Sequence, residues 1–387
     1  MKPLHGIRIV SVEQFGAGPY ATMMLADLGA EVIKIENAAI GGDPARKTGP
    51  YMLGENDSEY FQVFNSNKKS VALDLRGPEG KAALMRLIAT ADAVANNLRG
   101  DLPAKMGLDY KSLAAINPRV VCVHLSAYGR DNERAAWPGY DYLMQAESGL
   151  MHLTGEPDGP PARIGAPSMV DQCTGLTAAV ALLSGIIQAR STGKGCDMDV
   201  SLLDVALHQL GYTASWYLNE GLVSTRQPRS AHFSVAPVQT FPTADGWVFI
   251  MCMTDRFFGE LANAIGLPAL PTEPRFGTRA QRQDNREALT AIIDAEMRKQ
   301  PNAHWLKRLG GVLPIAPVLD LSDALDNAFL RETGMIRGVP HPEKEDMRTL
   351  ANPIKVDGQR LDQTVCSALG ADNDRYLAAS GAQRAAS

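Results

Sequence analysis

Short strands and helices alternate through the first third of this 387-residue chain, and this alternation restricts the fold more than any other feature. Residues 6–12 (GIRIVSV) are rich in β-branched side chains and predict a strand, a helix is expected next, and residues 30–36 predict a second strand. Further strands are predicted at residues 70–75, 91–96 and 118–125. Strands that alternate with helices form parallel sheets with both faces buried. We therefore predict an α/β fold with a parallel sheet.

The first strand–helix–strand unit carries a glycine pattern. Gly16-x-Gly18-x-x-Ala21 follows the first strand, and Glu36 lies near the end of the second, about where a dinucleotide-binding fold has the acid that binds ribose. NAD binding is therefore one hypothesis. Against it, packing at a strand-to-helix turn also requires glycine, and Pro19 interrupts the turn, so the pattern alone is a weak signal.

A second feature is an aspartate at the start of a long apolar helix. Residues 176–187 are apolar or small, Gly193 predicts the end of the helix, and Ser168 marks its start. Asp171 is thus expected in the first turn, where free N–H groups and the helix dipole favour an ionised carboxylate. Such a carboxylate can act as a nucleophile. An aspartate in a first turn is more often a helix cap, so both interpretations stay open.

Composition and charge exclude several classes of protein. The net charge of −5 argues against a nucleic-acid binder with a broad basic surface. A local basic patch for a phosphorylated cofactor is compatible with this charge. The first residues lack the pattern of a signal peptide, and we expect the apolar helix after Asp171 to be too short and interrupted to span a bilayer. The five cysteines include no CxxC pair, so neither a zinc site nor a disulfide framework is predicted. We expect a soluble cytoplasmic protein.

The second half predicts a smaller α+β domain. A helix is predicted at residues 199–217 and a hairpin with its turn at 244–246, followed by amphipathic helices. The last segments again predict strands and turns that return to the first domain. We place the large domain at residues 1–215 and 328–387, and the small domain at residues 222–320.

One loop suggests an anion site. Residues 41–50 are rich in turn formers and carry Arg46, whose planar guanidinium suits a carboxylate or a phosphate. The loop is predicted either to lie near an anionic ligand or to be a solvated surface loop, and composition alone favours the solvated form.

Six motifs, in this order and spacing, carry a resemblance over essentially the whole chain. They are GAGPYATMMLADLGAEVIKIE, GGDPARKTGP, FNSNKKSVALDL, LPAKMGLDY, PGYDYLMQAESGLMHLTGEPDGPP and VDQCTGL followed by STGKG. With them the chain resembles the family III CoA-transferases, which include formyl-CoA transferase and carnitine CoA-transferase. The resemblance implies a large Rossmann-like domain that binds CoA and not NAD, a smaller α+β domain, and a homodimer of interlocked, ring-like chains. It implies no metal and no permanently bound cofactor, with CoA or acyl-CoA as substrate.

The resemblance also implies the residues of the site. Asp171 would be the nucleophile, and Tyr140 and Arg46 would bind the substrate carboxylate. The implied CoA contacts are Gly16, Ala17, Leu73, Asp74, Leu75, Arg76, Asn97, Leu98, Arg99 and Lys105. Lys105 and Asn37 stand where formyl-CoA transferase has arginines that contact CoA, which leaves open which cations bind the CoA phosphates. His232 falls in the family's mobile loop, but the glycine run of that loop is missing here.

The implied reaction is covalent. Asp171 would attack an acyl-CoA thioester, with succinyl-CoA as a candidate donor, to give an aspartyl anhydride and then an aspartyl-CoA thioester, from which an acid accepts CoA. The related α-methylacyl-CoA racemases have Gly-His-Asp where this chain has Gly139-Tyr140-Asp141. Tyrosine, with an ordinary pKa of about 10, suits proton transfer at neutral pH poorly, which favours the transferase. The alternatives are a racemase or isomerase and a non-catalytic CoA-binding subunit.

Overall fold

The computed structural model describes residues 1–165 and 167–378, and its contacts divide the chain into two units. Unit 1 consists of Met1–Ser148, Ile164–Leu210 and Ala328–Ser387. Unit 2 consists of Gly149–Arg163 and Gly211–Asn327. Residues 149–163 and 211–215 therefore group with unit 2, whereas the sequence analysis placed them in the large domain.

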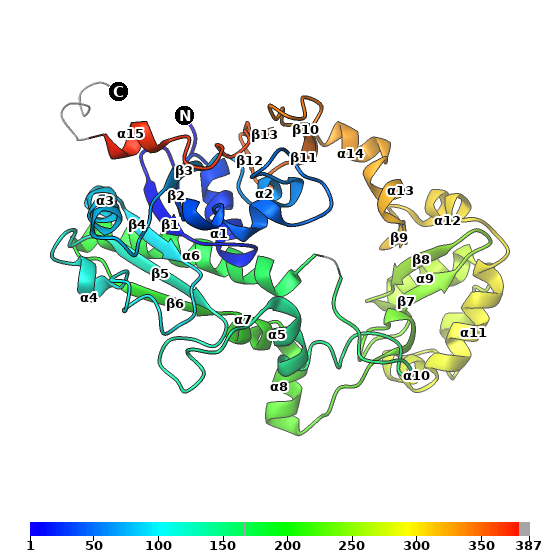
Figure 1. The fold of residues 1–387 in the computed structure, drawn as a ribbon. Coiled ribbons are helices and arrows are strands. Elements are labelled where there is room, and N and C mark those ends of the chain that lie inside the picture. Colours follow the sequence, from blue (N-terminus) through cyan, green and yellow to red (C-terminus); the bar gives the residue numbers. More distant parts are fainter. Residues whose placement is uncertain (166, 379–387) are drawn as a thin grey trace. The chain divides into compact units, whose positions relative to one another are not determined.

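A six-stranded parallel sheet forms the centre of unit 1 (Figure 1). Its strands are β1 (Arg8–Val12), β2 (Glu31–Glu36), β3 (Lys69–Ala72), β4 (Ala93–Asn96), β5 (Val121–Ser126) and β6 (Asp197–Ser201). Their order, β3-β2-β1-β4-β5-β6, is that of a dinucleotide-binding sheet and confirms the predicted α/β fold. The order reverses between β1 and β4, and ligands of such sheets bind beyond the carboxyl ends of the strands at this point.

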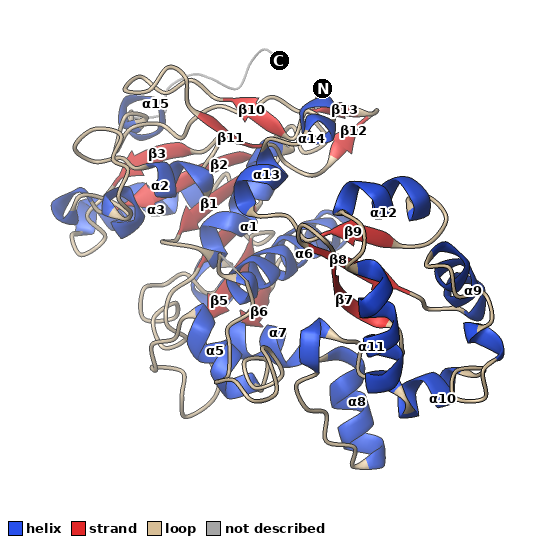
Figure 2. Ribbon diagram, turned by 90° about the vertical axis from the view of Figure 1, so that its right-hand side faces the viewer, coloured by secondary structure: helices blue, strands red, loops and turns tan. Residues whose placement is uncertain are grey.

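Helices cover both faces of this sheet (Figure 2). α1 (Ala17–Asp27) and α6 (Met169–Thr192) pack on one face, while α3 (Pro78–Ile88) and α4 (Tyr110–Leu113) pack on the other. α1 and α6 contact each other closely, because a Cβ added to Gly175 would lie 2.8 Å from the carbonyl oxygen of Ala17. This contact places the first turn of α6 beside the loop that joins β1 to α1.

The strand β6 corrects a prediction. The sequence analysis expected one helix over residues 199–217, but the chain forms β6 and then two helices, α7 (Leu202–His208) and α8 (Gly211–Glu220). The charged residues of β6 are bound by its neighbours: the Asp197 carboxylate lies 2.8 Å from His124 Nε2, and Asp199 accepts a hydrogen bond of 2.9 Å from Arg130. These partners come from β5 and the loop after it, so the local pattern did not reveal them.

Helix α6 is longer than predicted. It has 24 residues, and by length and composition it is the one helix of the described residues apolar enough to cross a membrane. Half of its most apolar window is buried within the protein. The expectation that this helix is too short to span a bilayer was therefore wrong as a statement about its length.

The remaining elements of unit 1 lie around the sheet. They are η1 (Ala38–Ile40), η2 (Pro44–Lys47), α2 (Glu59–Val63), α5 (Asp141–Ser148), α14 (Ala328–Glu332), β10 (Ile336–Gly338), β11 (Arg348–Leu350), β12 (Lys355–Val356), β13 (Gln359–Arg360) and α15 (Asn373–Leu377). β10 pairs with β11 and β12 with β13, both antiparallel. The C-terminal segment is tied to the sheet where the Ser70 N–H donates to the Asp372 carboxylate at 2.9 Å.

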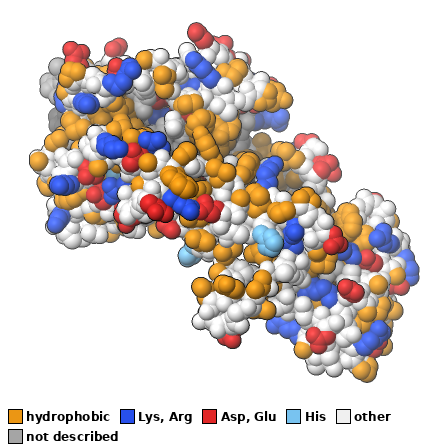
Figure 3. Space-filling model, turned by 60° about the horizontal axis from the view of Figure 1, so that its bottom comes forward, with side chains coloured by type: hydrophobic (Ala, Val, Ile, Leu, Met, Phe, Trp, Pro, Cys, Tyr) orange, Lys and Arg blue, Asp and Glu red, His pale blue; other side chains and the backbone are white. Residues whose placement is uncertain are grey.

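Unit 2 contains an antiparallel sheet of β7 (Val238–Pro242), β8 (Trp247–Met251) and β9 (Ile315–Pro317). Besides α8, its helical elements are η3 (Pro228–Ser230), α9 (Asp255–Ala264), η4 (Leu270–Thr272), α10 (Arg279–Asp284), α11 (Arg286–Met297), α12 (Asn302–Leu309) and α13 (Leu321–Leu325). Phe241, Phe258 and Trp305 are among the residues of its core. The β7–β8 hairpin agrees with the prediction, whereas the sequence analysis predicted no strand at β9. On the face drawn in Figure 3, acidic and basic side chains are interspersed.

Candidate active site

Asp171 lies in the first turn of α6 but does not cap this helix. The cap position belongs to Ser168, and the N–H of Asp171 donates to the carboxylate of Asp141 at 3.0 Å. The Asp141 carboxylate therefore accepts a hydrogen bond from one of the N–H groups in the first turn of the helix. Within the described residues, the Asp171 carboxylate has no hydrogen-bond donor. The geometry thus opposes the interpretation of Asp171 as a cap.

The environment of Asp171 raises its pKa. Burial is the main cause and the negative charge of Asp141 the second, and together they raise the pKa to about 7. Burial and the like charge of Asp141 therefore oppose the ionised form that we expected at the helix start. A carboxylate with a pKa near neutrality is more basic than an ordinary one, and at pH 8 most of it is ionised.

Asp141 is itself held in place. It is 3% exposed at the start of α5, and its second carboxylate oxygen accepts a hydrogen bond of 2.5 Å from Gln145. The side-chain oxygen of Gln145 in turn accepts from the Ile164 N–H at 2.8 Å. These bonds join α5 to the segment before α6 and fix the start of α6 from one side. The sequence analysis named Asp141 only as part of the Gly-Tyr-Asp run.

Gly16 contacts the Asp171 carboxylate from the other side. A Cβ added to Gly16 would lie 2.7 Å from Asp171 Oδ2, which is closer than a Cβ approaches any such atom. The next glycine of the pattern, Gly18, is equally crowded, since its Cβ would lie 2.9 Å from the Asn97 side chain. The glycine pattern is therefore required by close packing around Asp171 and β4, and a bound nicotinamide is not needed to explain it.

Two adjoining cavities open at the carboxyl ends of the strands. The first, of about 370 Å³, includes Asp171, and the second, of about 250 Å³, shares Gln14 and Leu98 with it. Six predicted residues line the first cavity besides Asp171, namely Gly16, Ala17, Asn97, Leu98, Arg99 and Tyr140. Four others line the second, namely Leu73, Asp74, Leu75 and Arg76. The fold thus brings most of the predicted residues to the switch point of the sheet.

The predicted cations of this region are paired with acids. Arg76 binds Asp74, and both Arg99 and Lys105 bind Asp101. The side chain of Lys105 is 67% exposed and lines neither cavity. Since these ion pairs are on the surface, an incoming phosphate can exchange with their carboxylates at small energetic cost.

Arg46 is not available to a substrate in this structure, which corrects the prediction for this residue. Its side chain is fully buried and binds both carboxylate oxygens of Glu36, each at 2.8 Å, above the ring of Phe61. Burial alone would raise the pKa of Glu36, but the hydrogen bond from Arg46 and the charges of Lys34 and Arg46 lower it to about 2. Glu36, the candidate ribose ligand of the NAD hypothesis, is thus already occupied.

Tyr140 and Tyr60 flank the site. Tyr140 is 65% exposed and lines the cavity of Asp171, so its side chain is accessible to a substrate. Tyr60, on α2, is close enough for the charge of Asp171 to contribute to its raised pKa, after burial as the main cause. The sequence analysis missed Tyr60, because no local signal relates α2 to α6.

A larger cavity lies elsewhere in unit 1. It has about 920 Å³ and opens at the amino ends of the strands, around Arg8 and Glu31. Its lining cations include Arg8 and Arg190, which bind Glu31 and Asp92. None of the residues predicted for the site lines it. Among the residues that the structure describes, no three His, Cys, Asp or Glu side chains gather as a metal site.

A partly buried carboxylate beside a cavity at the switch point of a Rossmann-like sheet is a typical arrangement of an enzyme site. Comparison with known proteins gives its class. Residues 4–373 match the model of CoA-transferase family III. The chain therefore belongs to CoA-transferase family III and is an enzyme of this family.

Curated relatives are similar over most of their length. The acetyl-CoA:oxalate CoA-transferase of Acetobacter aceti is 34% identical over 92% of this chain and 90% of its own. The succinate–glutarate CoA-transferase of Agrobacterium fabrum is 38% identical over 79% of this chain and 76% of its own. Among solved structures, a CAIB/BAIF family protein from Brucella suis has a TM-score of 0.84 at 33% identity and covers 97% of this chain and 99% of its own.

Proposed function

We propose that the enzyme transfers CoA from an acyl-CoA to a free carboxylic acid through covalent intermediates on Asp171. The observation that carries this proposal is the position of the Asp171 carboxylate: it borders the cavity, lacks a donor among the described residues, and has a pKa raised to about 7. A structural aspartate is normally hydrogen-bonded or paired. A carboxylate kept free at the mouth of a cavity is suited to nucleophilic attack.

The proposed reaction balances without a further reactant. Asp171 attacks the thioester carbonyl, the C–S bond breaks, and CoA leaves as a thiolate with an aspartyl anhydride left on the enzyme. The thiolate then attacks the aspartyl carbonyl and releases the first acid, which leaves an aspartyl-CoA thioester. The acceptor carboxylate attacks this thioester, and the returning thiolate converts the second anhydride into the new acyl-CoA. Backbone N–H groups of the glycine-containing loop beside Asp171 are suited to stabilise the oxyanions.

We propose small dicarboxylic acids as substrates, with succinyl-CoA as a donor. The support comes from relatives whose names specify succinyl-CoA and glutarate or acetyl-CoA and oxalate. Tyr140 is the candidate for a distal carboxylate, since its exposed side chain lines the cavity. Arg46, the other candidate from sequence, is withdrawn because its guanidinium is buried against Glu36.

We also propose that two chains form the functional homodimer, with unit 1 as the CoA-binding part. An apolar stripe on α6 supports the dimer: Leu176, Val180 and Ile187 follow each other at helical spacing and are 44%, 64% and 69% exposed. A long helix that exposes such a stripe is typical of an interface. The interlocked form of the dimer rests on the resemblance to the family.

The test is peptide mass spectrometry of the enzyme mixed with succinyl-CoA and then treated with hydroxylamine, which converts an activated carboxylate into a hydroxamate. We expect the modification on Asp171 in the wild type and its loss in Asp171→Asn. Asp141→Asn is the matched control, because it changes the neighbouring carboxylate and leaves the nucleophile. We expect it to retain the modification on Asp171, although at a different rate.

Two outcomes contradict the proposal. Modification of another residue, retained in Asp171→Asn, excludes Asp171 as the nucleophile. No modification with succinyl-CoA or with a panel of other acyl-CoAs opposes covalent transfer. Exchange of the α-proton of a branched acyl-CoA with solvent then indicates a racemase, and CoA binding without turnover indicates a non-catalytic subunit.

A further inference from the structure

The loop between β1 and α1 packs against Asp171, and the backbone of this loop is strained. Phe15, the residue before Gly16, has a φ of +59°, a left-handed conformation that is uncommon for a bulky side chain. Such strain persists only where surrounding contacts fix it. Because Gly16 contacts the Asp171 carboxylate, the conformation of Phe15 determines how closely the loop covers this carboxylate.

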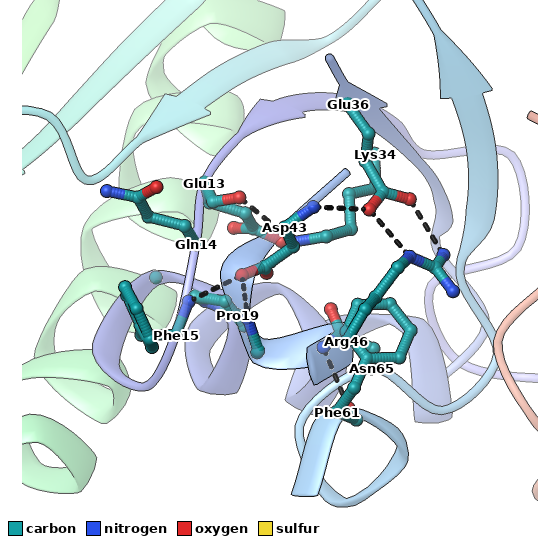
Figure 4. Close-up of polar contacts among 12 residues, drawn as sticks. Glu13, Gln14, Phe15, Pro19, Lys34, Glu36, Asp43, Arg46, Phe61 and Asn65 are labelled. Carbon is teal, nitrogen blue, oxygen red and sulfur yellow. Dashed lines mark hydrogen bonds and ion pairs between the residues drawn. The ribbon is translucent and has the colours of Figure 1, made fainter. Parts of the chain in front are cut away.

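Asp43 holds Phe15 in this conformation (Figure 4). Its Oδ1 accepts the N–H of Phe15 at 3.2 Å and the N–H of Ala45 at 2.9 Å. Its Oδ2 lies 2.8 Å from Lys34 Nζ, and neither side chain of this pair is exposed. Lys34 Nζ also donates to the carbonyl oxygen of Glu13 at 3.0 Å. The pair therefore binds the loop on both sides of Gln14.

A second buried lysine ties the start of the same loop to the first turn of α1. Lys68 Nζ binds the Glu13 carboxylate at 2.9 Å and the carbonyl oxygen of Pro19 at 2.8 Å. Asn65 Oδ1 accepts from the same ammonium group at 2.9 Å. Residues 13 and 19 are thus tied together below the loop, and the Asp43–Lys34 pair sets the conformation between them.

We infer that Asp43 is a positioning residue for the proposed reaction: paired with Lys34, it holds Phe15 in the left-handed conformation and so keeps Gly16 against the carboxylate of Asp171. The inference rests on the proposed function only for the role of Asp171. Among the described residues, Asp43 makes no hydrogen bond or ion pair with Asp171, so it acts through the backbone of the loop. Asp43 also lines the second cavity, but its Oδ1 accepts from the Phe15 and Ala45 N–H groups and its Oδ2 lies against Lys34 Nζ, so its carboxylate is engaged within the protein.

The inference predicts how Asp171 titrates when the loop is released. Gly16 contributes to the burial that raises the pKa of Asp171, so water that enters between them stabilises the ionised form. The other ionisable groups near Asp171 are Asp141 on α5, Tyr60 on α2, and Arg99 and Tyr140, which line the same cavity; none of them belongs to the loop. Loss of the Asp43 contact therefore lowers the pKa of Asp171 while these neighbours stay in place.

The experiment compares two double variants that differ by one acceptor. Lys34→Met/Asp43→Ala and Lys34→Met/Asp43→Asn both remove the two buried charges, but the second keeps an oxygen for the Phe15 N–H. The pKa of Asp171 is read from the pH dependence of its modification by a water-soluble carbodiimide, followed by peptide mass spectrometry. This reading needs no acyl-CoA, so a failure of the proposed function does not affect it.

We expect the midpoint of the pH dependence of Asp171 modification to fall by about one pH unit in the Asp43→Ala double variant. In the Asp43→Asn double variant it should stay near the wild-type value. We expect kcat to fall about 10- to 100-fold in the alanine variant, with the KM for acyl-CoA changed less than about threefold, since the contact positions the nucleophile and not the substrate. Asp27→Ala is the control for general destabilisation. Asp27 is 1% exposed and hydrogen-bonded, but it lies at the far end of α1, so the midpoint should not move.

Equal midpoints and equal kcat in the two double variants overturn the inference, as does an equal shift in Asp27→Ala. Should the alanine double variant not fold, the same comparison is made with Asp43→Ala and Asp43→Asn as single substitutions. If the midpoint moves as expected while no acyl-enzyme forms in the wild type, the positioning role stands and the proposed reaction fails.

Discussion

At the scale of single residues, the raised pKa of Asp171 makes the stability of the enzyme depend on pH. The pKa is about 7 in the folded protein and 3.8 in the unfolded chain, so the folded state binds the proton more tightly. Below the unfolded value both states are protonated. As pH rises from about 4 to about 7, the unfolded state loses its proton first, and the free energy of unfolding falls. Above pH 7 this loss is complete.

We therefore predict that Asp171→Asn stabilises the protein at pH 8 and much less at pH 5. The expected gain at pH 8 is about 1–2 kcal/mol, because an isosteric amide removes a carboxylate that is partly buried beside Asp141. Urea unfolding at the two pH values measures the difference. Asp158→Asn, at an exposed aspartate, is the control. An equal effect of Asp171→Asn at both pH values would show that the ionised carboxylate of Asp171 does not destabilise the folded protein.

Arg46 shows where prediction from sequence reaches its limit for a residue. A guanidinium in a glycine-rich loop suits either a ligand or an internal carboxylate, and the choice depends on what the fold brings to it. Glu36 lies ten residues earlier at the end of β2, and the loop folds back so that the two side chains pair in the interior. Asp171 was identified because a whole set of motifs surrounds it, whereas its partner Asp141 is defined only by the contact between α5 and α6.

At the scale of elements, the close packing of the β1–α1 loop on α6 gives a sharp test. Gly16 has a φ of −97°, outside the positive range that favours glycine, so the crowding of the new side chain is the main effect of a substitution there. We predict that Gly16→Ala lowers kcat at least about tenfold, because the new methyl group meets Asp171 Oδ2 at 2.7 Å and displaces the carboxylate. Steady-state kinetics with succinyl-CoA measures the loss.

The control for Gly16→Ala is Gly259→Ala. Gly259 lies within α9, and a Cβ there would meet no atom within 4 Å. Alanine is favoured over glycine in a helix interior by about 1 kcal/mol, so this variant should be fully active and slightly more stable. Full activity of Gly16→Ala would mean that the loop moves away from Asp171 in the working enzyme.

The elements themselves were predictable where a local pattern decides them. The strands β1, β2, β4 and β5 are short segments rich in apolar, mostly β-branched side chains, and this local pattern identifies them. β6 was missed because its sequence, DMDVS, has two aspartates whose partners lie in other parts of the chain. Its pairing with β5 completes the sheet, but this pairing is a tertiary contact and leaves no periodic signal in the sequence.

At the scale of the whole molecule, the family model and the curated CoA-transferases match most of the chain. The choice of substrate therefore depends on small differences around one site. Such differences are set by a few side chains and by neighbouring parts of an assembly. The order and spacing of the motifs predicted the family and the fold. The proposed dimer was expected only from the family resemblance, and the exposed apolar stripe on α6 became visible only in the structure.

We predict that a charge on this side of α6 prevents association of two chains. Val180 is 64% exposed at the middle of the apolar stripe, so Val180→Asp should leave the fold of the chain intact and should place an unpaired charge in the proposed interface. Size-exclusion chromatography with light scattering should give a dimer for the wild type and mainly monomer for Val180→Asp. Ile116→Asp, at a residue that is 42% exposed after α4, is the matched control and should remain dimeric. A dimer that tolerates aspartate at position 180 would place the interface elsewhere, and a monomeric wild type would show that the stripe is not covered by a second copy.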